Sequence, residues 1–263
     1  MDLGLRGKVA LVVAASKGLG RAVAHELAAE GAALAICSRD AGAIAAAGRD
    51  IAAATGAEVL AQAADVANPA DIAALVGATL ARFGRIDVLV TNGGGPSPGR
   101  FEALDAAAWQ RATELTLFAP IDLARHVLPG MKQRRWGRIL NITSIAVKQP
   151  VDNLMLSNSL RAAVTGWART LANEVAAHGI TVNNLMPGYT RTERVDELAG
   201  VSAQRDGITP EQATARWESE IPLGRLGEPR EFAALAAFLA SERASYITGT
   251  SIPVDGGWIK ALL

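Results

Sequence analysis

Short apolar runs alternate with longer segments of helical spacing along most of this chain, and this alternation constrains the fold more than any other feature. Each apolar run is followed by a turn and then by a helix-patterned segment. Strands are expected at residues 9–13, 33–37, 59–63, 86–91, 138–143 and 181–185. Helices are expected from Arg21 to Gly31 and at residues 41–54, 71–83, 109–131 and 157–178. The pattern predicts a doubly wound α/β fold, a parallel sheet of about seven strands with helices on both faces and right-handed crossovers.

Length and charge fit one domain that binds a small ligand. The 263 residues, half of them hydrophobic, suit a single domain over residues 1–263 better than two small ones. Lys plus Arg and Asp plus Glu number 26 each, so charge gives no reason to expect nucleic acid or an anionic membrane as partner. No signal peptide or run of roughly 20 apolar residues stands out. A soluble protein is expected.

Cysteine and histidine give no sign of a metal site. The single cysteine, Cys37, excludes an intrachain disulfide and a cysteine-based metal cluster, and it suits a reducing compartment, so we expect a cytoplasmic protein. The three histidines, His25, His126 and His178, lie on separate expected helices without metal-ligand spacing. No metal is expected.

The turn after the first expected strand, VVAASKGLGRAVA, contains a Gly-x-Gly pair. Glycine lets the backbone pass close to a phosphate, and the helix that follows presents free N–H groups and the positive end of its dipole. A tight strand-to-helix turn alone would also explain the pair, but its position between strand and helix favours dinucleotide binding. The expected contacts are Ala15, Ser16, Lys17, Gly18, Leu19 and Gly20.

The end of the second expected strand bears on the choice of cofactor. A protein that binds NAD(H) usually places a carboxylate there, whereas Ser38 and Arg39 can hold a 2′-phosphate, and Lys17 adds a second cation. Alternatively, both cations are ordinary solvated charges, and Asp40 partly neutralises Arg39. The residues favour NADP(H) over NAD(H).

Five ordered motifs carry a resemblance to the short-chain dehydrogenase/reductase family over nearly the whole chain. They are VAASKGLG, the Asp65-Val66 pair, TNGG at 91–94, PGYTRT at 187–192 and VDGGW at 254–258. The resemblance implies a Rossmann-type fold and further cofactor contacts, which are Asp65 and Val66 at the adenine, Asn92, Gly93 and Gly94 at the nucleotide floor, and Pro187, Gly188, Thr190 and Thr192 at the nicotinamide. The family's turn usually opens Thr-Gly. The methyl group of Ala14 here should narrow the turn without abolishing the phosphate contacts of later amides.

The catalytic residues that the resemblance implies are only partly present. The family uses a serine that binds the substrate carbonyl, a tyrosine that donates the proton, a lysine that lowers the pKa of that tyrosine, and an asparagine that supports a water relay. The corresponding residues are Ser144, Ser157, Arg161 and Thr116, in that order. Three of the four differ, and the two tyrosines of the chain, Tyr189 and Tyr246, lie outside this segment.

The source of the proton therefore stays open. An aliphatic hydroxyl is a far weaker acid than a phenol, whose pKa is about 10, so Ser157 is not expected to donate directly. It could hold a water while Arg161 stabilises developing alkoxide charge. Lys148 could donate if it is partly buried, or it is a solvent-facing loop charge. Alternatively, Ser144 caps nearby backbone and Ser157 caps a helix.

Three functions fit these residues. The first is an NADP(H)-dependent oxidoreductase acting on a small carbonyl or alcohol, similar to 3-oxoacyl-carrier-protein reductases, with a non-standard proton relay. The second is an NADP-binding protein with little or no redox turnover. The third is a non-redox enzyme, because halohydrin dehalogenases carry arginine at the position of Arg161. However, they keep the tyrosine and lose the nucleotide cradle, the reverse of this chain.

The resemblance also implies a substrate lid and an oligomer. The lid would span about residues 192–223, where Glu193 and Asp196 are expected to be exposed charges. Relatives commonly form homotetramers, or homodimers, through the two long helices that correspond to 109–131 and 157–178. The substrate and the direction of the reaction do not follow from the sequence.

Overall fold

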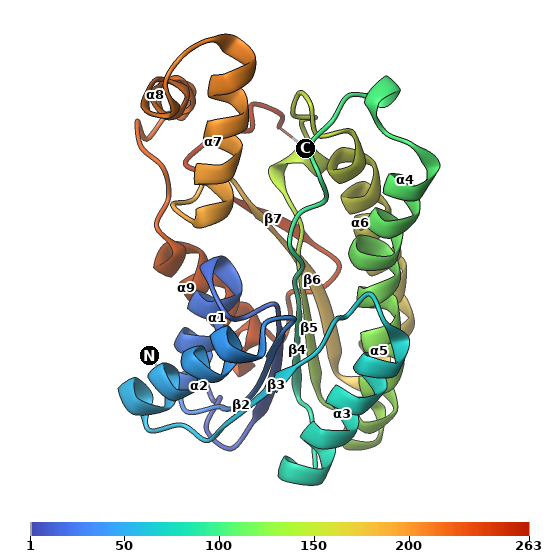
Figure 1. Cartoon of the computed structure of the whole chain (residues 1–263). Coiled ribbons are helices and arrows are strands. Elements are labelled where there is room, and N and C mark those ends of the chain that lie inside the picture. Colours follow the sequence, from blue (N-terminus) through green and yellow to red (C-terminus); the bar gives the residue numbers. More distant parts are fainter. Residues whose placement is uncertain (1, 263) are drawn as a thin grey trace.

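The computed structural model describes residues 2–262 and contains one parallel sheet with helices on both faces (Figure 1). In the described residues the seven strands lie in the order β3-β2-β1-β4-β5-β6-β7. Their bounds are β1 Val9–Val13, β2 Ala33–Ser38, β3 Val59–Ala63, β4 Val88–Thr91, β5 Gly137–Ile142, β6 Ile180–Pro187 and β7 Ser251–Val254. The predicted doubly wound α/β fold is confirmed, and the bounds of β1 through β6 differ from the expected ones by at most two residues, whereas β7 had no expected range.

Two groups of helices cover the two faces of the sheet. One group is α1 Gly18–Ala29, α2 Ala41–Thr55 and α9 Pro229–Ala240, and the other is α3 Pro69–Phe83, α5 Ala119–Arg134 and α6 Met155–Val175. The remaining helices, α4 Ala106–Thr113, α7 Glu193–Asp206 and α8 Pro210–Glu220, lie toward the carboxyl ends of the strands (Figure 1). No helix within residues 2–262 is long and apolar enough to cross a membrane.

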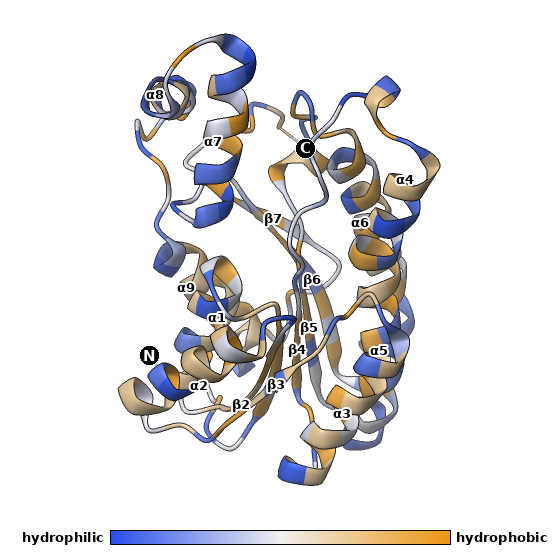
Figure 2. Cartoon of the chain, in the orientation of Figure 1, coloured by the Kyte–Doolittle hydropathy of each residue, from blue (hydrophilic) through white to orange (hydrophobic). Residues whose placement is uncertain are grey.

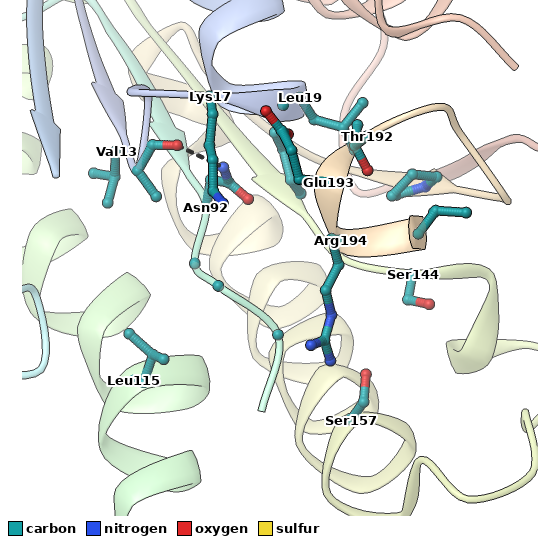
Figure 3. Close-up of a pocket in the computed structure, with 18 of the residues that line it drawn as sticks. Val13, Lys17, Leu19, Asn92, Leu115, Ser144, Ser157, Thr192, Glu193 and Arg194 are labelled. Carbon is teal, nitrogen blue, oxygen red and sulfur yellow. Dashed lines mark hydrogen bonds between the residues drawn. The ribbon is translucent and has the colours of Figure 1, made fainter. Parts of the chain in front are cut away.

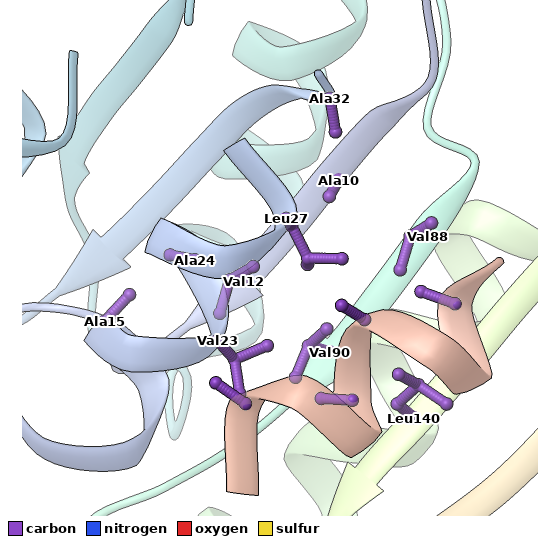
Figure 4. Close-up of a cluster of buried hydrophobic side chains, with 14 of the residues drawn as sticks. Ala10, Val12, Ala15, Val23, Ala24, Leu27, Ala32, Val88, Val90 and Leu140 are labelled. Atoms are coloured by element: carbon purple, nitrogen blue, oxygen red, sulfur yellow. The ribbon is translucent and has the colours of Figure 1, made fainter. Parts of the chain in front are cut away.

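Alternate residues of each central strand pack against different helices. In β1, Ala10 and Val12 belong to the core under α1 and α9, while Leu11 and Val13 belong to the core under α3 and α5. Figure 4 shows Val23 and Leu27 of α1 lying over Val12 of β1 on the first side. Figure 2 shows the hydrophobic residues concentrated along the strands. Burial on both faces explains why the strands are continuous apolar runs in the sequence.

The helix expected at 109–131 has a different local form. The α4 helix runs into a π-helical turn, Glu114–Phe118, before α5 begins. Pro120 has no N–H to donate to the preceding turn, and the amide of Ala119 bonds instead to the carbonyl of Glu114, five residues back. The turn changes which backbone groups face the neighbouring loops, at the position where the sequence aligns Thr116 with the relay asparagine.

Candidate active site

A cavity of about 580 Å³ lies at the carboxyl ends of the strands (Figure 3). Its walls come from the loops after β1 through β6 and from α7. The strand order reverses between β1 and β4, and doubly wound sheets bind ligands in the crevice at such a switch point. The sequence predicts that the cofactor and the substrate bind at this end of the sheet.

The turn after β1 is shaped for close approach of an anion. Gly18 has a φ of +57°, and a Cβ on Gly20 would overlap the carbonyl oxygen of Ala14 and lie 2.8 Å from Nδ2 of Asn92. Asn92 Nδ2 donates to that same carbonyl at 3.3 Å. The α1 helix begins without a side-chain cap and without an acidic residue in its first turn. Its free N–H groups fit the phosphates of a dinucleotide.

Ala14 adopts a backbone conformation that favours glycine. Its φ of +52° lies in the left-handed region, where a Cβ costs about 1–2 kcal/mol. Besides the expected narrowing of the turn by its methyl group, Ala14 therefore adds backbone strain at the start of the Gly-rich turn.

At the end of β2, the side chain of Arg39 is available to bind a ligand. Asp40 uses its carboxylate to cap α2, accepting from the amide of Ala43 at 2.9 Å, and Ser38 Oγ donates to the carbonyl of Asp40 at 3.0 Å. Arg39 is exposed and lines the cavity, as Lys17 does. Among the described residues no carboxylate lies within 4.0 Å of the guanidinium of Arg39. This arrangement suits a 2′-phosphate.

The remaining expected cofactor contacts also come together. Asp65, Val66, Asn92, Gly93, Gly94, Pro187, Gly188, Thr190 and Thr192 all line the cavity, with Ser16, Gly18, Leu19 and Ser38. A Cβ on Gly188 would lie 2.7 Å from the Cα of Asp255, so the Pro-Gly loop passes directly over the C-terminal segment. Two expected contacts do not line it. Ala15 and Gly20 are buried behind the turn, and the amide of Ala15 donates to the carbonyl of Cys37.

Three of the five catalytic candidates line the same cavity. They are Ser144, Ser157 and Arg161. Ser144 Oγ accepts from the amide of Ala146 at 3.1 Å and so caps a short 3₁₀ helix. Ser157 is 8% exposed and lies in the first turn of α6, whose N-cap is Leu154, so the alternative that Ser157 is the cap is wrong. The helix begins at Met155, two residues before the expected start.

Arg161 connects α6 to the end of β5. Its Nη1 donates to the carbonyls of Ile142 at 2.7 Å and Thr143 at 2.8 Å. Burial and, to a smaller extent, the charge of Arg194 lower the pKa of Arg161 to about 10. The guanidinium is therefore cationic at neutral pH, and it can stabilise a negative charge much more readily than it can release a proton.

Thr116 and Lys148 do not line the main cavity. Thr116 lines a separate pocket of about 20 Å³, large enough for one water, that also reaches Arg161 and Asn141. Lys148 is exposed and does not line the main cavity, so the structure does not support the partial burial on which its acid role depended. Within residues 2–262 no group of three or more His, Cys, Asp or Glu side chains could hold a metal ion.

Comparison with known proteins agrees with this geometry. A family profile described as enoyl-(acyl carrier protein) reductase matches residues 13–259. One similar protein, the 3-oxoacyl-[acyl-carrier-protein] reductase FabG of Vibrio cholerae, is 36% identical over 256 residues, covering 97% of this chain and 98% of its own.

The chain belongs to the short-chain dehydrogenase/reductase family.

Two further similar proteins are described with NADPH as their cofactor. The NADPH-dependent reductase BacG of Bacillus subtilis is 34% identical over 97% of this chain and 99% of its own. The L-sorbose reductase of Gluconobacter frateurii, solved with NADPH and L-sorbose, matches with a TM-score of 0.95 and 35% identity over 100% of both chains. The family profile and FabG differ in the group whose reduction their names describe, an enoyl group for the profile and a 3-oxoacyl group for FabG.

Several cavity residues of this family member were not anticipated from its sequence. Glu193, Arg194, Val195, Glu197 and Leu198 of α7 line the cavity, together with Tyr189. Figure 3 shows Glu193 beside Leu19 and the side chain of Arg194 directed toward Ser157. Glu193 was expected only as an exposed lid charge. Their position could have predicted this, because these residues directly follow Thr192, an expected cofactor contact, at the start of α7.

Proposed function

We propose that this protein is an NADP(H)-dependent oxidoreductase that transfers hydride between the nicotinamide and a carbonyl or alcohol substrate, with a non-standard proton relay. The observation that carries the proposal is that one cavity joins the Gly-rich turn, Arg39 and the Pro-Gly loop to Ser144, Ser157 and Arg161. A dinucleotide held along the first set would bring its nicotinamide to the second set.

The cofactor end of the cavity supports NADPH over NADH. Arg39 and Lys17 would hold the 2′-phosphate, Ser38 would add a hydroxyl, and the start of α1 would hold the pyrophosphate. Relatives whose names specify NADPH support the same preference. When bound, NADPH supplies the hydride.

The reacting end supports a relay that ends in water. Ser144 would donate a hydrogen bond to the substrate oxygen, because its hydroxyl accepts from Ala146 and keeps its own hydrogen free for the substrate. Ser157 is too weak an acid to donate its proton to the substrate, so it would position a water in the space that a phenol would fill. Arg161 would stabilise the negative charge that develops on the substrate oxygen.

Stopped-flow spectroscopy tests the proposal. NADPH-loaded protein would be mixed with a panel of ketones, aldehydes, 3-oxoacyl thioesters and enoyl thioesters, and the oxidation of NADPH followed by absorbance. We expect oxidation with at least one carbonyl substrate. Tight NADPH binding without any oxidation would favour the alternative of a binding protein with little turnover. Failure of NADPH to bind below millimolar concentration would contradict both and favour a non-redox enzyme of the dehalogenase type.

The proposal extends to location and assembly. We expect a cytoplasmic homotetramer, or a homodimer, that forms through the face presented by α4, α5 and α6. The exposed side chain of Phe118, 56% of its surface, lies between α4 and α5 and supports an apolar contact there. Light scattering coupled to size-exclusion chromatography would show the oligomeric state. We further propose that the chain forms a single domain, and that the segment of about residues 192–223, which contains α7 and α8, is the substrate lid.

A further inference from the structure

We infer that the substrate carries a carboxylate, and that Arg194 and Arg161 bind it beside the reacting carbon. This inference rests on the proposed function, because it names the class of substrate for the same cavity. Two arginine side chains from different elements, α7 and α6, reach the one end of the cavity that also contains Ser144 and Ser157. Paired guanidiniums in a cavity are a recurring means of binding a carboxylate.

The position of Arg194 is fixed by the loop after β4. Its Nη2 donates to the carbonyl of Pro96 at 3.0 Å, and a Cβ on Gly95 would lie 3.1 Å from the same nitrogen. The guanidinium therefore lies close to the backbone of Gly95 and Pro96, and Arg194 lines the cavity. Figure 3 shows the guanidinium of Arg194 directed toward Ser157.

Arg161 reaches the cavity from α6 and has unused donors. Only its Nη1 bonds to the backbone, at Ile142 and Thr143. A guanidinium carries five N–H groups, so several donors remain for a ligand. The two arginines are close enough that the charge of Arg194 contributes to the lowered pKa of Arg161. An anion between them would remove this repulsion.

The carboxylates of the chain do not neutralise this end of the cavity. Glu197 is the single acidic partner of Arg194 in the described residues, at 3.4 Å from Nη1, and its side chain is 59% exposed. Glu193 also lines the cavity, but it lies beside Leu19 and within reach of Gly18, at the end expected for the phosphates. Among the cavity-lining residues from α6 and α7 near Ser157, Arg161 and Arg194 thus face one exposed carboxylate, Glu197, while Asp152 and Glu220 act on Tyr189 elsewhere in the wall.

The rest of the wall indicates an organic acid rather than an inorganic anion. Ile145, Val151, Leu154, Val195 and Leu198 line the cavity near the two arginines. Apolar side chains around a few polar groups are typical of pockets for small organic ligands. A carbonyl compound with a short apolar chain and a terminal carboxylate matches both features.

Matched acids and esters test the inference through turnover. Pyruvate, acetoacetate and levulinate place the carboxylate at three distances from the carbonyl, and the methyl ester of each removes the charge; levulinate is the cleanest pair, because its carbonyl lies farthest from the ester and is least activated by it. We expect at least one acid to be reduced with a kcat/KM about tenfold or more above that of its ester, because charge-assisted hydrogen bonds discriminate by this amount. Equal or better reduction of all three esters would overturn the inference while leaving the proposed oxidoreductase intact.

Variants of Arg194 separate recognition from structure. We expect Arg194→Gln to lower kcat/KM for the preferred acid about tenfold, to leave its methyl ester within about twofold, and to leave NADPH affinity unchanged. Arg194→Lys should recover part of the loss. Arg191→Gln is the matched control, because Arg191 lies three residues away, is exposed, pairs with Glu218 and Glu228, and does not line the cavity. An equal loss for acid and ester would indicate a merely structural role and overturn the inference.

A binding measurement keeps the inference testable without turnover. Hexanoate and hexanamide would be titrated into the NADPH complex, with the fluorescence of the bound cofactor as readout. We expect hexanoate to bind about tenfold more tightly than hexanamide, and Arg194→Gln to remove the difference. If no carbonyl compound is reduced but this preference appears, the proposed function fails and the carboxylate site stands. If hexanamide binds as well as hexanoate, the carboxylate site fails.

Discussion

The guanidinium of Arg161 is held at the end of β5 by the carbonyls of Ile142 and Thr143 while it faces the cavity. A lysine in its place would offer three donors on a flexible chain, whereas the planar guanidinium bonds to both carbonyls and keeps donors for a ligand. In the proposed relay Ser157 takes the place of a larger phenol, which would leave room at this end of the cavity for a charged group and a water together.

Restoring the phenol and its lysine tests whether an acid is all that is missing. We expect the double variant Ser157→Tyr with Arg161→Lys to raise the kcat for reduction of a neutral ketone at least about tenfold, because a positioned general acid contributes about 10²–10⁴-fold. Steady-state kinetics with NADPH would measure it. Arg161→Lys alone is the control and should give no gain. An unchanged rate in the double variant would mean that the pocket differs in more than its acid.

Arg39 is one of the two exposed cations, with Lys17, that are proposed to hold the 2′-phosphate. We expect Arg39→Ala to weaken NADPH binding about tenfold and NADH binding less than twofold, since only NADPH carries the 2′-phosphate. Fluorescence titration of both cofactors would show the split. Arg49→Ala, another arginine of the same half of the chain that does not line the cavity, is the control. Equal weakening of both cofactors would refute the assignment to Arg39.

Backbone strain at Ala14 gives a prediction about stability. Ala14→Gly should raise the free energy of unfolding by about 1 kcal/mol, because glycine adopts a φ of +52° without the penalty of a Cβ. Ala32→Gly, at a buried residue where φ is not positive, should lower it. Denaturant titration would compare the two variants, and a lower stability of Ala14→Gly would show that the turn is not strained.

At the scale of elements, an aromatic cluster connects α8 to the Pro-Gly loop. Tyr189, which lines the cavity, stacks on Trp217 of α8 with ring centroids 4.7 Å apart and an interplanar angle of 13°. Its ring also meets the edge of Trp258 at 6.0 Å, and Nε1 of Trp258 donates to Glu220 at the end of α8. Burial raises the pKa of Tyr189 to about 12, so the phenol stays protonated at neutral pH.

Removing the stacked ring should loosen the proposed lid. We expect Trp217→Ala to raise the KM of the substrate about three- to tenfold with a smaller effect on NADPH affinity, because stacked aromatic pairs contribute about 0.5–1.5 kcal/mol. Hydrogen exchange should increase in α7 and α8. Trp109→Ala in α4 is the control, since this partly buried ring belongs to a different cluster. Unchanged exchange in α7 and α8 would show that other contacts hold these helices in place.

At the scale of the molecule, the sequence was sufficient for the sheet and for most of the cavity. Apolar runs such as Val9–Val13 are buried on both faces, so their pattern does not depend on details of packing. Loops after parallel strands must meet at one edge, which is why Lys17, Arg39, Asn92 and Gly188 could be assigned to one site in advance.

The sequence did not predict features that depend on the direction of one side chain or on one backbone hydrogen bond. Whether Arg194 points into the cavity or into solvent depends on the carbonyl of Pro96, ninety-eight residues away in the chain. The interruption of the expected helix 109–131 depends on the missing N–H of Pro120. The contact between Arg194 and Pro96 is tertiary and leaves no pattern in the sequence. Pro120 is visible in the sequence, but the helical spacing around it continues and predicts one uninterrupted helix.

Ligand binding should stabilise the whole molecule in proportion to affinity. We expect NADPH at about 100 times its Kd to add about 2.7 kcal/mol to the free energy of unfolding, and NADH at the same concentration to add less. Thermal unfolding with each cofactor would show the difference. The Arg39→Ala variant should show nearly equal shifts for the two cofactors. A larger shift with NADH than with NADPH in the unchanged protein would contradict the cofactor preference.

The aromatic cluster has an optical consequence. Two of the five tryptophans of the chain, Trp217 and Trp258, lie on either side of a residue that lines the cavity. The nicotinamide of NADPH absorbs light at the wavelengths where tryptophan emits, so a bound cofactor would accept their excitation energy. Trp217 belongs to α8, and Trp258 of the C-terminal segment is hydrogen-bonded to Glu220 at the end of α8, so a displacement of α8 would change the environment of both donors. Tryptophan emission, compared between the unchanged protein and Trp217→Ala, would therefore report cofactor binding beside the proposed lid without an attached dye.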